Sequence, residues 1–217
     1  MKPADLRGLY EEIANSVSHA VGLGLAAAGW SALLVRSIDS GDPWRMVAAL
    51  VFGTCMLSMY VSSVLYHGYQ IQPLKHMFRV CDHITIYFVI SGTFTPFLLV
   101  FDRSAYGWTM LGVIWGMTFM GVIYKLFFFG RPERESVGTY AIMTIVAFIA
   151  AIPVVEHVGT PCLAWLAGGL VCYMIGVYFY LNDQKPFYHT VWHFWVIGGS
   201  TCHYIGIWVY LVGPAPL

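Results

Sequence analysis

The chain has 217 residues, of which 59% are hydrophobic and only 10% are charged. Soluble domains carry about 25% charged residues, so this composition predicts a protein that crosses a membrane several times. The 11 lysines and arginines balance the 11 aspartates and glutamates, and the formal net charge is zero. A neutral chain gives no electrostatic reason to expect nucleic acid as a partner.

Seven segments are apolar over the roughly 20 residues that a helix needs to cross a bilayer. They lie at Val17–Val35, Met46–Tyr66, Val80–Phe101, Tyr106–Phe128, Val137–Val155, Cys162–Leu181 and Thr190–Val212. The connections between them are too short for a separate soluble domain. The sequence therefore predicts one all-α membrane domain over residues 1–217, a bundle of seven transmembrane helices, with residues 1–16 as a short cytoplasmic segment before the first span.

Basic residues gather on one side of this predicted bundle. Eight fall on the side of the N-terminus and three on the other: Lys2, Arg7, Lys75, Arg79, Lys125, Arg131, Arg134 and Lys185 against Arg36, Arg45 and Arg103. Because cytoplasmic loops are enriched in lysine and arginine, this bias predicts a cytoplasmic N-terminus and an outside C-terminus. Lys125, near the inner end of the fourth span, is expected to reach up to the lipid headgroups.

Four ionisable residues lie at the ends of apolar runs, where a membrane protein tolerates them least: His67, Asp82, His189 and His193. Such residues are costly in a membrane and by default indicate function. With seven spans, the second ends and the third and seventh begin on the same side of the membrane. Topology alone therefore predicts that these four residues meet near the inner leaflet.

The types and spacing of these residues indicate a metal site. His189 and His193 are four residues apart, so both imidazoles can bind one ion from the same helix face. His67 would complete a three-histidine set, which in zinc enzymes leaves a fourth position for water or substrate. Asp82 could hold or deprotonate that water. Zinc is favoured over iron or copper because the sequence contains no redox ligand set.

Structural interpretations of the same residues stay open. The histidine pair could hydrogen-bond to carbonyl groups or lipid phosphates, and a metal joining two spans could serve only to hold them together. Glu12, Asn15, Ser16 and His19 follow helical spacing and form one polar stripe that leads into the first span. This stripe fits capping and interhelical hydrogen bonds better than closure of the site.

Several pieces of sequence occur in a fixed order along the chain. They are Glu12-x2-Asn15-x2-Ser18-His19, Ser63-x3-His67, Asp82, Ser91-Gly92-Thr93-Phe94-Thr95-Pro96 and His189-x3-His193. The set resembles the progestin and adiponectin receptor family, most closely its bacterial hemolysin III-type members, over essentially the whole chain. It implies a seven-helix bundle in which three histidines bind zinc, with Asp82 and Ser63 near the zinc-bound water; the histidines are His67, His189 and His193.

The resemblance also implies kinship with alkaline ceramidases, a bacterial inner membrane and, for bacterial members, links with haemolysis and membrane homeostasis. The leading hypothesis is a zinc-dependent hydrolase of a lipid amide or ester, in which Asp82 accepts a proton from water and Ser63 steadies the nucleophile or the oxyanion. A membrane lipid is then the substrate or ligand. The alternatives are a receptor or membrane-state sensor with a structural zinc and, suggested by the family name alone, a pore-forming hemolysin.

Overall fold

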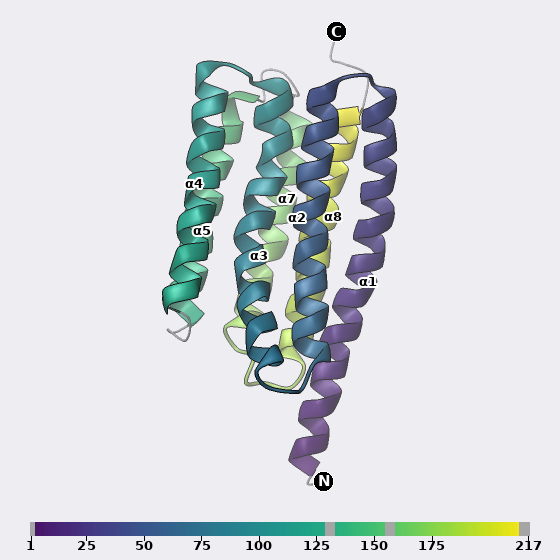
Figure 1. Cartoon of the computed structure of the whole chain (residues 1–217), viewed down its shortest axis with the longest axis vertical. Helices are drawn as coiled ribbons and strands as arrows, with labels where there is room; N and C mark the ends of the chain where they lie inside the picture. Colours follow the sequence, from purple (N-terminus) through teal and green to yellow (C-terminus); the bar gives the residue numbers. More distant parts are fainter. Residues whose placement is uncertain (1–2, 129–132, 155–158, 213–217) are drawn as a thin grey trace.

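The computed structural model describes residues 3–128, 133–154 and 159–212, and these are almost entirely helical (Figure 1). The long helices are α1 (Pro3–Asp39), α2 (Pro43–Gly68), α3 (Leu74–Pro96), α4 (Ala105–Phe128), α5 (Glu133–Ala151), α7 (Thr160–Tyr180) and α8 (Tyr188–Val212). Two short helical segments follow α3 and α5, namely the π-helical η1 (Phe97–Phe101) and the 3-10 helix η2 (Ile152–Val154). The predicted all-α class is confirmed for the described residues.

Six of the long helices, α1 to α5 and α7, are long and apolar enough to cross a membrane. The predicted seventh span, Thr190–Val212, lies within α8, which has the necessary length at 25 residues. Among the described residues, α8 is not one of these six helices. Crossing by α8, and with it the seven-span topology, stays a prediction.

Helix α1 is longer than the first predicted span. It runs without a break over 37 residues, which corresponds to about 55 Å, against roughly 30 Å for the hydrocarbon core. In Figure 1 its N-terminal part projects beyond the lower ends of the other helices. Glu12, Asn15 and His19, expected to lead into the first span, therefore belong to the same rigid helix.

Close helix packing places α1 against α2 and α8. α1 contacts both α2 and α8, and α7 packs along α8. Two glycines permit the close approach of α1 and α2, since a Cβ at Gly22 would overlap the Tyr60 ring and one at Gly53 would overlap the Trp30 ring. The indole of Trp30 then donates a hydrogen bond to the carbonyl of Ala49 at 3.0 Å.

The lower end of the bundle in Figure 1 holds the end of α2 and the starts of α3 and α8. α2 ends there at Gly68, α3 begins at Leu74 and α8 begins at Tyr188. The α2–α3 and α7–α8 connections both lie at this end. This is the convergence that the sequence predicts for the polar residues of the second, third and seventh spans.

Candidate metal centre

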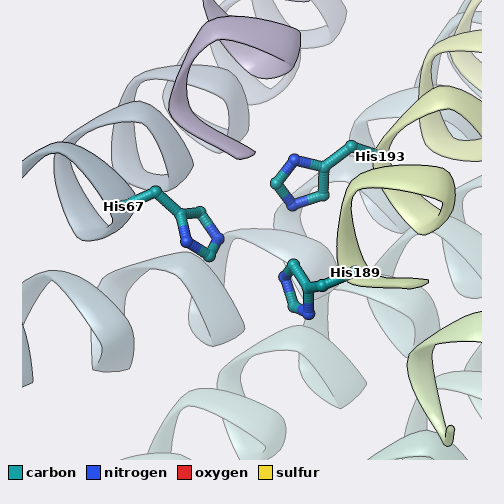
Figure 2. A group of neighbouring side chains, drawn as sticks. All are labelled: His67, His189 and His193. Atoms are coloured by element: carbon teal, nitrogen blue, oxygen red, sulfur yellow. The ribbon is translucent and has the colours of Figure 1, made fainter. Parts of the chain in front are cut away.

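Three histidines converge at the lower end of the bundle, one from the last turn of α2 and two from the first turns of α8 (Figure 2). The ring centroid of His67 lies 5.0 Å from that of His189 and 5.1 Å from that of His193. The two α8 rings are 4.8 Å apart. One ligand nitrogen from each ring lies within 4.8 Å of the other two, a group that could hold a metal ion.

The group fits the coordination of a small divalent cation after a slight contraction. Nitrogens bound to tetrahedral zinc at about 2.0–2.1 Å are about 3.4 Å apart, so modest side-chain rotations would close the shell. Imidazole suits zinc, and it also suits copper, iron and nickel. The geometry supports a metal site; the identity of the ion stays a prediction.

Glu12 on α1 holds the His67 ring in place. Its Oε2 atom accepts a hydrogen bond from Nδ1 of His67 at 2.7 Å, and its Oε1 atom accepts one from Nζ of Lys75 at 2.7 Å. Because a carboxylate accepts from Nδ1–H, the lone pair of His67 is on Nε2. That atom is buried and has no hydrogen-bond partner, as expected of a metal ligand whose other nitrogen is held by a carboxylate.

A backbone carbonyl of α1 fixes the orientation of the His193 ring in the same way. Nδ1 of His193 lies 3.1 Å from the carbonyl of Asn15 and 3.0 Å from Oγ of Ser18. Since a carbonyl only accepts, Nδ1 carries the hydrogen and Nε2 is left to bind a metal. The Asn15 side chain in turn accepts from the hydroxyl of Thr190. His189 is held less tightly, because its Nδ1 lies 3.9 Å from Oδ2 of Asp183.

His19 and Ser63 lie beside the histidine group. Nδ1 of His19 is 2.6 Å from Oγ of Ser63, and Ser63 is also within hydrogen-bonding reach of the Asp82 carboxylate. The rings of His19 and His193 are stacked, with centroids 3.5 Å apart and planes 16° from parallel. Asp82, Ser63 and His19 therefore form a chain of polar contacts that links α3, α2 and α1.

This polar chain forms one end of a cavity of about 430 Å³. His19, Ser63, Asp82 and His193 line that end, and mostly apolar side chains of α3, α5, α7 and α8 line the rest. Ile145 of α5 and Met174 of α7 line the cavity and are also exposed, by 57% and 59%. These two side chains therefore form part of the wall between the cavity and the surface at α5 and α7.

The structure brings the three predicted metal-binding histidines together. It also shows contacts to them from α1 that the sequence did not predict. His67, His189 and His193 meet, while Asp82 lies outside the ligand group and shares the cavity wall with Ser63. Sequence reasoning gave the α1 polar stripe a mainly structural role. Glu12, Asn15 and His19 contact the histidine group directly, while Ser16 donates to the carbonyl of Val64 on α2. The helical spacing of the stripe was the available signal for these contacts.

Lys125 does not reach the headgroups, so that prediction is wrong. Its side chain is buried, with only 4% exposed. Nζ lies 2.8 Å from Nδ1 of His83 and donates to Oγ of Ser136 at 2.6 Å. α3 and α5 pack around the end of α4 and offer these acceptors, which compensate for the loss of water around the ammonium group.

Comparison with known families matches residues 8–204 to the family described as haemolysin-III related. Hemolysin-3 of Bacillus cereus is 34% identical over 183 residues, covering 84% of each chain. The hemolysin-3 homolog of Bacillus subtilis (strain 168) is 33% identical over 183 residues, 84% of this chain and 86% of the relative. The human monocyte to macrophage differentiation factor is 31% identical over 190 residues, which cover 85% of this chain and 77% of the relative. The chain therefore belongs to the haemolysin-III related family, within the progestin and adiponectin receptor family that its motifs resemble.

Proposed function

We propose that this protein is a zinc-dependent hydrolase of a lipid amide or ester and that it acts in membrane lipid homeostasis. The observation that carries the proposal is the position of the three-histidine group. One of its members, His193, lines a mostly apolar cavity of about 430 Å³ together with Asp82 and Ser63. A purely structural metal would need neither the cavity nor an acidic group outside the ligand shell.

The residues around the group have distinct tasks in such a reaction. His67, His189 and His193 would hold the zinc ion, which would supply a water acidic enough to react near neutral pH. Asp82 accepts the proton that the water loses on attacking the carbonyl carbon. Once Asp82 has taken that proton, the Ser63 hydroxyl no longer donates to it and can donate a hydrogen bond that steadies the oxyanion. Asp82 then returns the proton to the leaving amine or alcohol as the C–N or C–O bond breaks.

The shape of the cavity suits a lipid that enters from the bilayer. Its polar end would receive the amide or ester linkage, and the apolar walls from α3, α5, α7 and α8 would receive the acyl chain. A lipid would enter between α5 and α7, where Ile145 and Met174 line the cavity and are also exposed at the surface. With the N-terminus in the cytoplasm, the linkage lies near the inner leaflet of the bacterial inner membrane.

Lipid profiles of cells carrying the wild-type protein or Asp82→Asn test this function. The hydrolase predicts that the variant accumulates an amide or ester lipid and loses the matching fatty acid. Identical lipid profiles at equal protein levels would contradict it.

A second candidate is a receptor or membrane-state sensor in which the metal only joins helices. One observation favours it: the histidine group links α2 to α8, and Glu12 and Asn15 tie both helices to α1. A lipid that filled the cavity could then bias the packing of the three helices without being cleaved. The pore-forming alternative rests on the names of relatives alone.

A further inference from the structure

His19 has a ring nitrogen that the proposed metal centre does not use. The side chain is 3% exposed, and its Nε2 atom is buried without a hydrogen-bond partner. Buried polar groups nearly always have a partner, because leaving one unpaired costs about 1–3 kcal/mol. His67 Nε2 is also unpaired, and a metal ion would account for it. His19 needs a different explanation.

The stacked geometry prevents His19 from binding the same ion as His193. A metal lies close to the plane of the imidazole that binds it, at about 2.0–2.1 Å from the nitrogen. The two rings are nearly parallel at 16°, with centroids 3.5 Å apart. An ion in the plane of His193 therefore lies well outside the plane of His19. The His19 residue lines the cavity of about 430 Å³, so we take a molecule held in that cavity as the partner of the free nitrogen.

The neighbours of His19 determine whether Nε2 donates or accepts. An ionised Asp82 takes the hydroxyl hydrogen of Ser63, which is within its reach. The Ser63 oxygen must then accept from Nδ1–H of His19 across the 2.6 Å contact. Neutral imidazole carries a single hydrogen, so Nε2 is an acceptor. Only a ligand that brings an N–H or O–H group can satisfy it.

We propose that His19 is a substrate-contacting residue whose Nε2 accepts a hydrogen bond from an N–H or O–H group beside the cleaved linkage of the lipid. This inference rests on the proposed function, because it takes Asp82 to be the ionised base. A secondary amide carries such a donor and the corresponding ester does not. His19 thus gives the site a preference for amide lipids over esters of the same shape.

Two probes of matched shape test the preference, N-butyldodecanamide and butyl dodecanoate. Their binding is measured as initial displacement of a fluorescent fatty acid from the zinc-loaded protein, before turnover. Wild-type protein is compared with His19→Phe and His19→Leu. Tyr60→Phe serves as the control, because this ring packs edge-on to His19 at 5.2 Å but does not line the cavity. Zinc content is determined on every sample.

The wild-type protein and Tyr60→Phe should bind the amide about tenfold more tightly than the ester, since the ester leaves Nε2 unpaired. Both His19 variants should keep zinc and bind the two probes equally. Equal binding by the wild-type protein would mean that Nε2 pairs only with water, and it would overturn the inference even if neither variant folds. A preference that persists in zinc-loaded His19 variants would overturn it as well.

These outcomes are separable from those for the hydrolase itself. A protein that cleaves lipid but shows no His19-dependent preference disproves the role of His19 and leaves the hydrolase intact. If the preference depends on His19 but neither probe is cleaved, the hydrolase activity is disproved. The proposed hydrogen bond to His19 is then supported as a binding contact.

Discussion

The carboxylate of Glu12 and the Nδ1 atom of His67 lie 2.7 Å apart, and this contact joins α1 to α2 at the histidine group. The second oxygen of Glu12 accepts from Lys75 at the start of α3. A single acidic side chain therefore orients a candidate ligand and is itself fixed by a lysine. Such carboxylate–histidine pairs raise ligand basicity and select the nitrogen that faces the metal.

Glu12→Gln should lower zinc affinity about 10- to 100-fold, because a neutral amide polarises the His67 ring less than a carboxylate. Glu11→Gln is the matched control: it makes the same change one residue earlier on α1, where the carboxylate pairs with Arg7. Chelator competition on the two purified variants measures the difference. Equal zinc affinities would show that Glu12 does not support the metal site.

Purified protein should contain about one zinc per chain, because three neutral imidazoles and one further ligand complete a tetrahedral shell. Alanine at His67, His189 or His193 should lower the zinc content sharply. His203→Gln should not, since that buried ring contacts the carbonyl of Leu166 at 3.2 Å, away from the group. Elemental analysis checks this. Full zinc content in a double variant with alanine at His189 and His193 would remove the proposed site.

Lys125→Met should destabilise the protein by about 1–3 kcal/mol, because His83 and Ser136 would lose a buried charged partner. Lys185→Met removes the same charge from an exposed loop and should change stability little. Thermal unfolding in one detergent compares the two variants. If they unfold alike, the buried Lys125 contacts contribute nothing measurable to stability.

Reporter fusions should place the N-terminus, the α2–α3 connection and the α7–α8 connection in the cytoplasm and the C-terminus outside. This result would establish α8 as the seventh span, despite its three histidines. A C-terminus on the same side as the N-terminus would instead indicate an even number of spans and contradict the predicted topology.

Much of the fold could be predicted because hydropathy and helix length are local properties of the sequence. The predicted segment Val80–Phe101, for example, falls within α3 and η1, which together begin earlier, at Leu74, and end at Phe101. The meeting of His67 with His189 also followed, because an even number of crossings between them returns the chain to the same side. Neither prediction requires knowledge of how the helices are rotated about their axes.

Helix rotation and register account for what the sequence did not reveal. The contacts of Asn15 with His193 and of Glu12 with His67 depend on where α1 sits against α8 and α2. No local pattern specifies that position. A lysine near a helix end usually extends to water, and Lys125 does not, because acceptors on two neighbouring helices enclose it.

The central claim is that the metal centre is catalytic, and Asp82→Asn tests it most directly. Asp82 lies outside the histidine group, so the variant should keep zinc and thermal stability. It should lose most lipid turnover, about 100-fold or more, because an amide cannot accept the proton. Zinc content, unfolding temperature and lipid hydrolysis are measured on one preparation. Unchanged hydrolysis with zinc in place would contradict the account and favour the sensor.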